Sequence, residues 1–284
     1  MSAHPRLSMN QATIKYASLS TALEVVSNAG LESIGLWREP VAEVGLDTAV
    51  QLVADSGLRV SSLCRAGFFT MEEGPARRAS IDENRRAIAE TAALGAPTLV
   101  LVAGGLPVGS RDLAGARERV RDAIGELASD AAAAGISLAI EPLHPMYVSD
   151  RAVVSTLGQA LDIATQFDSA TVGVVVDTFH VFWDPQVLEQ IARAGAGGYI
   201  ASYQVCDWAT PLPADVLLAR HYPGDGVIDF TPLTRAVIEA GYTGDIEVEI
   251  FNQDIWDAQP LDVVTRTTAA FEATIAADLE AARV

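Results

Sequence analysis

Four oxygen-bearing side chains stand at the ends of short apolar runs in the second half of the chain. Glu141 lies near the end of the run ISLAIEP, Asp177 ends VGVVVD, Gln204 lies near the end of YIASYQV, and Glu249 lies near the end of DIEVEI. Buried strands of a parallel sheet read as continuous apolar runs, and their carboxyl ends gather the ligands of α/β folds. We therefore expect these side chains to meet at one site, although Asp177 alone would also suit the N-cap of a following helix.

The alternation of side chains along these runs predicts which residues point into a barrel and which face its helices. Glu141, Asp177, Gln204 and Glu249 then point inward, as does Glu247 one layer below Glu249. A shift of two residues in the register of this last run would exchange the expected roles of Glu247 and Glu249. The side chains expected on the outer face are Leu138, Ile140, Val174, Val176, Ala201, Tyr203, Val205, Ile246, Val248 and Ile250.

Three carboxylates and an amide at one barrel mouth favour a metal site. Buried like charges cannot all stay ionised without a cation. An all-oxygen donor set suits a hard divalent ion such as Mn²⁺ or Mg²⁺, whereas zinc prefers histidine and cysteine. The alternative is that some of these residues cap helices or bind loops, which is less expected for four residues on successive strand ends.

Eight short apolar runs alternate with longer, alanine-rich amphipathic stretches along the whole chain. This alternation has no linker rich in Pro, Gly or Ser. It therefore predicts one (β/α)8 TIM-barrel domain over residues 1–284 rather than a doubly wound sheet, which usually has fewer strands. The expected strands are 7–14, 32–37, 59–65, 97–104, 136–142, 172–177, 199–205 and 245–250, and the expected helices include 21–30, 47–57, 77–95, 111–135, 232–241 and 260–284.

Five stretches carry a resemblance to a known superfamily. AIEPLHP, VVVDTFH, YQVCDW, RHYPGDGVIDF and IEVEIFN, in this order and spacing, are similar to stretches of the sugar phosphate isomerase and epimerase superfamily with its xylose isomerase-like TIM barrel. The chain resembles the inosose isomerase and ketose 3-epimerase type, closely over its second half and more weakly over its first. The resemblance is specific for the superfamily and leaves the substrate open.

The resemblance implies that Glu141, Asp177 and Glu249 are metal ligands. The fourth ligand of the family is usually a histidine, and Gln204 holds that position here, so we expect the metal to bind more weakly. His180, in the DTFH stretch, and Arg220, before PGDG, match residues that usually hold substrate oxygens.

Histidine and tryptophan residues gather just beyond the expected strand ends. His144 stands where many ketose epimerases have no histidine, and we interpret it as an extra acid or base, with loop packing as the alternative. Trp37 and Trp183 are expected to be apolar pocket walls against the C–H faces of a sugar. The histidines and tryptophans without an assigned site role are His4, His221, Trp208 and Trp256.

These residues fit a metal-dependent isomerase or epimerase acting on a keto-sugar or a keto-cyclitol such as an inosose. Mn²⁺, or else Mg²⁺ or Co²⁺, would stabilise the cis-enediolate that forms when a C–H proton leaves, and Glu141 and Glu249 would remove and return that proton. The alternative is a dehydratase or eliminating lyase on an inosose or 3-keto-glycoside, with His144 as acid or base. The sequence has no strand-GxGxxG-helix signature of a nucleotide cofactor.

Charge argues against several other classes of protein. A net charge of −18 and a pI near 4.5 oppose nucleic-acid binding and disfavour an AP-endonuclease-like hydrolase, which needs a basic DNA face. A non-catalytic sugar-binding barrel stays an alternative if the site with Gln204 has lost its metal. Homo-oligomerisation is compatible with the resemblance and with aromatic loops.

Cysteine usage and hydropathy indicate the compartment. Cys64 and Cys206 lie far apart without a CxxC motif, which predicts reduced thiols. The first residues lack the apolar segment of a leader, and no apolar run reaches the roughly 18 residues of a membrane span. We expect a soluble, cytoplasmic protein with no membrane partner. The stretch AGGLPVGSR could bind a phosphate through its amides, but a tight loop is the preferred interpretation.

Overall fold

The computed structural model describes residues 3–281 and shows eight parallel strands that close into a barrel. Around the barrel the strands follow the order β1-β10-β7-β6-β5-β4-β3-β2, so neighbours in the chain are neighbours in space once the short antiparallel pair β8–β9 is set aside. The predicted (β/α)8 barrel is confirmed. The strands are β1 Leu7–Asn10, β2 Ser33–Trp37, β3 Arg59–Gly67, β4 Thr98–Val102, β5 Ser137–Glu141, β6 Val172–Asp177, β7 Ile200–Val205, β8 Asp207–Trp208, β9 Arg220–His221 and β10 Ile246–Val248.

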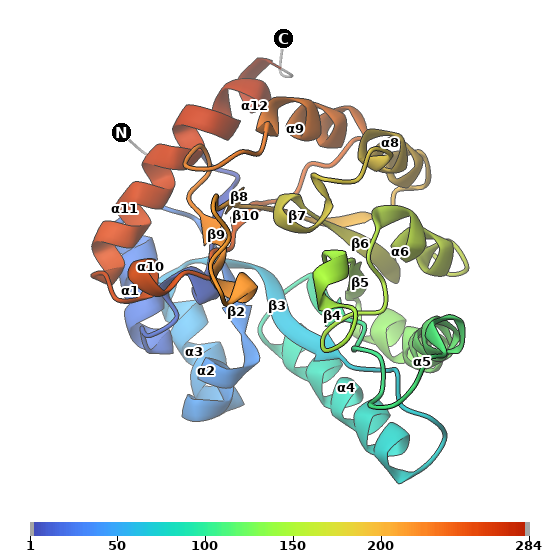
Figure 1. Ribbon diagram of the computed structural model, residues 1–284. Helices are drawn as coiled ribbons and strands as arrows, with labels where there is room; N and C mark the ends of the chain where they lie inside the picture. The colour runs from blue at the N-terminus through green and yellow to red at the C-terminus, as the bar shows by residue number, and fades with distance from the viewer. Residues whose placement is uncertain (1–2, 282–284) are drawn as a thin grey trace.

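Helices surround the barrel, and the last long helices lie beside the first ones where the ring closes (Figure 1). None of the helices within residues 3–281 combines the length and the apolar character needed to cross a membrane. The α-helices are α1 Leu19–Asn28, α2 Arg38–Val44, α3 Leu46–Ser56, α4 Pro75–Ala93, α5 Leu113–Ala134, α6 Leu157–Ala164, α7 Thr178–Val181, α8 Val187–Gly197, α9 Phe230–Glu239, α10 Gln253–Trp256, α11 Pro260–Phe271 and α12 Ala277–Ala281, and the shorter turns are η1 Gln11–Ile14, η2 Pro145–Tyr147, η3 Val216–Leu218 and the π-turn η4 Glu272–Ala276.

Two predicted elements change type before their expected ends. The predicted strand 7–14 is wrong in its second half, because β1 ends at Asn10, whose side-chain oxygen accepts a hydrogen bond from the N–H of Ala12 and caps η1. The predicted helix 260–284 is interrupted by the π-turn η4, and its last positions, 282–284, lie outside the described residues. The pair β8–β9 was not predicted, since two-residue strands leave no periodicity to read.

Side chains on the two faces of the barrel follow the predicted alternation with one exception. Tyr203 points outward, and its hydroxyl lies 2.9 Å from the hydroxyl of Thr234 on α9. The predicted outward position of Ala201 is wrong, because Ala201 packs against an inward-facing cluster that includes Val175. The pairing of β6 with β7 shifts register between Val174 and Val175, which breaks strict alternation at this level of the barrel.

Glu247 links three strands inside the barrel. Its carboxylate accepts a hydrogen bond from Asn10 Nδ2 at 2.9 Å, and Asn10 Oδ1 accepts one from the indole Nε1 of Trp37 at 2.8 Å. Gly35 of β2 leaves the space for this carboxylate, because a Cβ at residue 35 would lie 2.0 Å from Glu247 Oε2. Glu247 therefore sets the position of the Trp37 ring through Asn10.

The close approach of Gly35 to Glu247 predicts a selective loss of stability. Gly35→Ala should lower the free energy of unfolding by about 1–3 kcal/mol, because an extra methyl group in a filled core forces its neighbours to move. Gly125→Ala on α5 is the matched control: its Cβ would meet Phe167 at ordinary contact distances of 3.6 and 3.7 Å, and alanine favours helix. Urea denaturation measures both variants, and an unchanged Gly35→Ala protein would contradict the tight packing.

Candidate active site

A cavity of about 380 Å³ opens at the end of the barrel where the carboxyl termini of the strands lie. This is the face on which TIM barrels carry their active sites. Of the nine residues that the sequence assigned to the site, five line the cavity. They are Trp37, Glu141, His180, Arg220 and Glu249. Asp177 and Gln204 are buried on the neighbouring strands β6 and β7.

Arg220 lies at the centre of the buried charges. Its Nη1 donates to Asp177 Oδ2 at 3.1 Å and to Glu249 Oε2 at 2.8 Å. Its guanidinium also lies between two aromatic rings, with Cζ 4.8 Å from the ring centre of Phe179 and 4.9 Å from that of Phe251. Charge-assisted bonds on the edge and aromatic faces on both sides fix the cation in one place.

Asp177 caps a helix and also contacts the central guanidinium of the cluster. Its Oδ1 accepts a hydrogen bond from the N–H of Phe179 at 2.8 Å and caps α7, while its Oδ2 binds Arg220. A carboxylate has two oxygens, so the cap and the site role do not compete. The cap fixes the carboxylate at the end of β6, where the side chain is fully buried.

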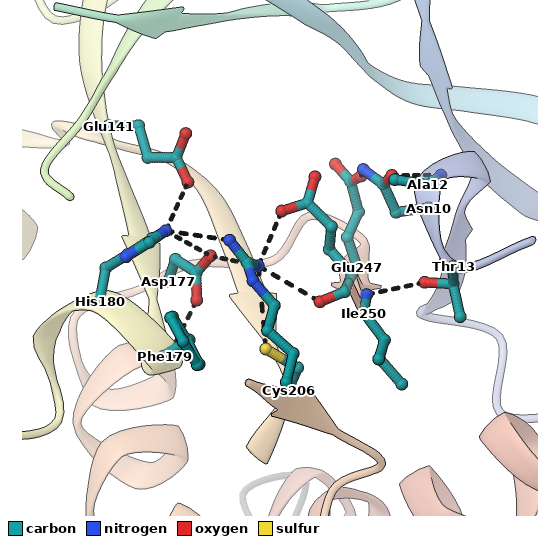
Figure 2. A network of polar contacts seen from close by, with 12 residues as sticks. Asn10, Ala12, Thr13, Glu141, Asp177, Phe179, His180, Cys206, Glu247 and Ile250 are labelled. Atoms are coloured by element: carbon teal, nitrogen blue, oxygen red, sulfur yellow. Dashed lines mark hydrogen bonds and ion pairs between the residues drawn. The ribbon is translucent and has the colours of Figure 1, made fainter. Parts of the chain in front are cut away.

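Glu141, Asp177 and His180 converge on one point (Figure 2). His180 Nε2 lies 3.8 Å from Glu141 Oε1 and 3.8 Å from Asp177 Oδ2. One potential ligand atom from each of the three residues lies within 4.8 Å of the others. The prediction assigned His180 to the substrate alone, whereas this geometry also offers its ring nitrogen to a cation.

Both ring nitrogens of His180 face hydrogen-bond donors. The backbone N–H of His144 donates to Nδ1 at 3.1 Å, and Arg220 Nη2 lies 2.9 Å from Nε2. Burial lowers the pKa of His180 well below its usual value, so the ring is neutral and has one N–H and one lone pair. A neutral ring accepts from only one of these donors, so whichever nitrogen carries the proton, one of the two contacts sets two N–H groups against each other.

Gln204 is the buried amide of the cluster. Asp177 on β6 and Glu247 on β10 are its register neighbours across the two adjoining strands. Neither its side-chain oxygen nor its side-chain nitrogen has a hydrogen-bond partner within residues 3–281. An unsatisfied buried amide costs about 1–3 kcal/mol, so an oxygen acceptor beside carboxylates fits the predicted fourth metal ligand.

The charges of the cluster fit a divalent cation. Glu141, Asp177 and Glu249 are all buried and contribute three negative charges, of which Arg220 compensates one. Burial raises the pKa of Glu141 well above its usual range, raises that of Asp177, and raises that of Glu249 to about 7. A divalent ion would neutralise the remaining two charges and would allow all three carboxylates to stay ionised.

His144 and Trp183 do not line the cavity. The ring of His144 packs against Trp183 and Trp208, with ring centres 5.4 and 5.1 Å apart, and its Nδ1 accepts from the N–H of Met146. Trp183 Nε1 donates to the carbonyl of His180 at 2.7 Å. Both residues therefore position His180, and the geometry gives no support to His144 as an acid or base.

Sequence reasoning missed several residues that line the cavity. Lys15, Arg65, Tyr147 and Phe251 all do so. Two of them carried a signal: Arg65 ends the predicted strand 59–65, much as Glu141 lies near the end of its own, and Lys15 is the only lysine of the chain. The strand-end rule that selected the carboxylates would also have selected Arg65.

Two further sequence predictions concern the loop after β4 and the cysteines. Gly104 and Leu106 use their N–H groups to bond the carbonyls of Arg151 and Val148, so these amides of AGGLPVGSR hold a neighbouring loop, which supports a tight turn. Cys64 and Cys206 are both buried free thiols, as predicted.

The sequence pattern of the family described as "Xylose isomerase-like TIM barrel" matches residues 23–274. The chain therefore belongs to this family, and the predicted resemblance is confirmed. Protein SMc04130 from Sinorhizobium meliloti 1021 has a solved structure that is 44% identical to this chain, with a TM-score of 0.91 and coverage of 94% of this chain and 98% of that one. The IOLI protein with a bound zinc atom is 21% identical, covers 96% and 98% of the two chains, and has the same fold with a TM-score of 0.84.

Relatives of assigned function are enzymes of more than one kind. The 3-dehydroshikimate dehydratase of Pseudomonas aeruginosa is 30% identical over 161 residues, which make up 54% of this chain and 23% of that protein. The inosose isomerase of Bacillus subtilis is 29% identical over 138 residues, 48% of this chain and 47% of that protein. The aligned parts thus span less than half of either relative.

The raised carboxyl pKa values predict that the metal-free protein loses stability as pH rises. Folded Glu249 keeps its proton up to about pH 7, whereas an unfolded glutamate loses it near 4.5, so the folded state binds more protons between these values. The resulting stability is complete below about pH 4.5 and is lost as the pH rises through 7. Thermal melting in chelator at a series of pH values from 5 to 8 measures this slope.

Two variants isolate the contribution of Glu249. Glu249→Gln has no proton to lose and should show a weaker decline of melting temperature with pH than the wild type. Glu189→Gln, on the exposed face of α8, should keep the wild-type slope. An identical slope in Glu249→Gln and wild type would show that this carboxyl does not hold its proton in the folded chain.

Proposed function

We propose that this protein is a divalent-metal-dependent isomerase or epimerase that acts on a keto-sugar or a keto-cyclitol such as an inosose. The observation that carries the proposal is the cluster of Glu141, Asp177 and Glu249, of which the two glutamates line the cavity and Asp177 is buried beside it, with two negative charges left after Arg220 compensates one. Membership of the family and the likeness to inosose isomerase support the substrate class.

Five residues are available to hold the cation. Glu141, Asp177, Gln204 and Glu249 are the proposed ligands, and His180 lies close enough to Glu141 and Asp177 to join them. Mn²⁺ is the proposed ion, with Mg²⁺ or Co²⁺ as alternatives, because most of the donors are oxygens. When bound, the cation supplies a Lewis acid for a substrate carbonyl and the hydroxyl next to it.

Glu141 and Glu249 are the proposed acid–base pair. Glu141 ends β5 and Glu249 follows β10, with β6 and β7 between them, so the two carboxyls reach the cavity from separate strands. With the cation bound both carboxylates would stay ionised, as a base requires, whereas without it burial raises the pKa of Glu249 to about 7. One carboxylate takes the C–H proton beside the carbonyl; return of a proton to the other face gives an epimer, and return to the neighbouring carbon gives an isomer.

The other residues of the cavity orient the substrate. Neutral His180 has one lone pair, so its two proposed roles belong to alternative tautomers: an Nε2–H that donates to a substrate oxygen while Nδ1 accepts the backbone N–H of His144, or an unprotonated Nε2 that joins the metal ligands. Arg220 presents its remaining N–H groups, and Trp37 offers an apolar wall whose position is set by Asn10. These contacts hold the reacting carbon next to the carboxylates.

A dehydratase is the second candidate, and a specific observation favours it. Two 3-dehydroshikimate dehydratases from Pseudomonas species match this chain at 30% and 34% identity, over 161 and 124 residues. The same enolate loses water when a hydroxyl stands β to the carbonyl. His144 lies outside the cavity, whereas Glu141 and Glu249 line it, so the carboxylate that has taken the C–H proton would deliver it to the departing hydroxyl.

Metal content tests the ligand set. The protein purified without chelator and incubated with Mn²⁺ should hold about one Mn²⁺ per chain by mass spectrometry, and Asp177→Asn and Glu249→Gln should lose it while keeping the wild-type circular dichroism. Glu247→Gln is the matched control, because Glu247 bonds Asn10 and does not line the cavity. Loss of metal only in Glu247→Gln would show that Glu247, and not Glu249, is the metal ligand. A wild-type protein that binds no metal would favour a non-catalytic sugar-binding barrel.

Turnover in D₂O separates the two candidate reactions. An isomerase or epimerase incorporates solvent deuterium into an inosose or D-psicose without loss of water, whereas a dehydratase converts 3-dehydroshikimate to a product lighter by one water. Glu141→Gln and Glu249→Gln should each slow the reaction about 10²–10⁴-fold, because each removes a general acid or base. His144→Gln should stay much closer to the wild type. Absence of exchange and of water loss with all three compounds would contradict both candidates.

A further inference from the structure

Two cations line the cavity on the side of the barrel formed by β1, β2 and β3. Lys15 follows η1 at the end of β1, and Arg65 lies near the end of β3. In the closed ring, β2 stands between β1 and β3 and is opposite β6, the strand that carries Asp177, whereas β1 adjoins β10, which Glu249 follows. The two positive charges therefore lie on the arc from β1 to β3, and Glu141, Asp177 and Glu249 lie on the rest of the ring.

Neither cation is neutralised within the described part of the chain. Most arginines of residues 3–281 pair with a carboxylate, but Lys15 and Arg65 have none within 4.0 Å. Carboxylates are not scarce, since the chain has 37 acidic residues, and Glu39 and Glu43 of α2 line the same cavity without pairing with either cation. Arg151 also lines the cavity, but it pairs with Asp150 at 3.5 Å.

Aromatic rings hold the two cations in place of carboxylates. Lys15 Nζ lies 4.2 Å from the ring centre of Trp256, and Arg65 Cζ lies 5.0 Å from that of Phe68 and 5.7 Å from that of Trp37. A ring face orients a cation without cancelling its charge.

We propose that Lys15 and Arg65 form a subsite for an anionic group, a carboxylate or a phosphate, on the substrate. This inference rests on the proposed function and narrows its substrate to an anionic keto compound. The buried carboxylates repel an anionic group and the two cations attract it, so the charge of the substrate favours an orientation with its anionic group toward Lys15 and Arg65 and its carbonyl end toward Glu141 and Glu249. An arginine fork and a lysine ammonium each suit either kind of oxyanion.

Matched pairs of probes test the subsite by calorimetry on the Mn²⁺-incubated protein. One pair is 3-dehydroshikimate and its methyl ester, which differ in the charge of the carboxylate. The other is D-psicose 6-phosphate and D-psicose, so the two pairs distinguish a carboxylate from a phosphate. The charged member of one pair should bind at least about tenfold more tightly than its neutral partner, as expected for a charge-assisted contact.

Variants assign that preference to the two residues. Lys15→Gln and Arg65→Gln should each weaken binding of the charged probe about five- to tenfold and leave the neutral probe unchanged. Arg65→Lys keeps the charge and should retain most of the preference, which guards against a folding defect in Arg65→Gln. Arg111→Gln, an exposed arginine outside the cavity, is the control for loss of one positive charge and should change neither affinity.

Each outcome bears on one proposal. If no charged probe gains over its neutral partner, whether both bind or neither binds, the anionic subsite is overturned. A preference for the charged probe that persists in Lys15→Gln and Arg65→Gln also overturns it. The charged probe could also bind more tightly in a way that depends on Lys15 and Arg65 while the protein catalyses neither deuterium exchange nor water loss. That result would support the subsite and would overturn the proposed reaction.

Discussion

The structure of the site depends on three buried carboxylates that share one guanidinium. Asp177 and Glu249 both accept hydrogen bonds from Arg220. Glu141 lies 3.8 Å from Nε2 of His180, and this nitrogen lies 2.9 Å from Arg220 Nη2. One guanidinium cannot compensate three buried charges, so the folded chain either keeps protons on the carboxyls or recruits a divalent cation. Three features accompany this excess of buried negative charge. They are the raised carboxyl pKa values, the side-chain amide of Gln204 without a hydrogen-bond partner within the described residues, and the two donors that compete for the one lone pair of His180.

The barrel brings these charges together by very different means. Strands β5, β6 and β7 carry their polar residues at the mouth because each strand is apolar until its end and the register aligns those ends. Arg220 instead arrives on the antiparallel pair β8–β9, which folds back over the cavity. Phe179 and Phe251 then hold its guanidinium between their rings, so apolar packing fixes the position of the central charge.

One such site permits more than one reaction. The same carboxylates can return a proton to a carbon or deliver it to a departing hydroxyl, and the relatives of this chain include both inosose isomerase and 3-dehydroshikimate dehydratase. The choice depends on the substrate that the cavity accepts. Trp37, Lys15 and Arg65 line the same cavity as Glu141 and Glu249, and in the proposed subsite the two cations select which molecules lie across the cavity and in which direction.

The sequence alone determined the fold class and the carboxylates, because strand ends and alternation are local properties of the chain. Eight apolar runs predicted the eight barrel strands, and the alternation placed Glu141, Asp177 and Glu249 inward. Only the tertiary structure decided what depends on side chains distant in sequence. It showed that Ala201 faces inward at a register shift and that His144 packs between Trp183 and Trp208 outside the cavity. It also brought Lys15 and Arg65 into the same cavity as Glu141 and Glu249, because the closure of the ring, which no local pattern encodes, determines which strand ends meet at its mouth.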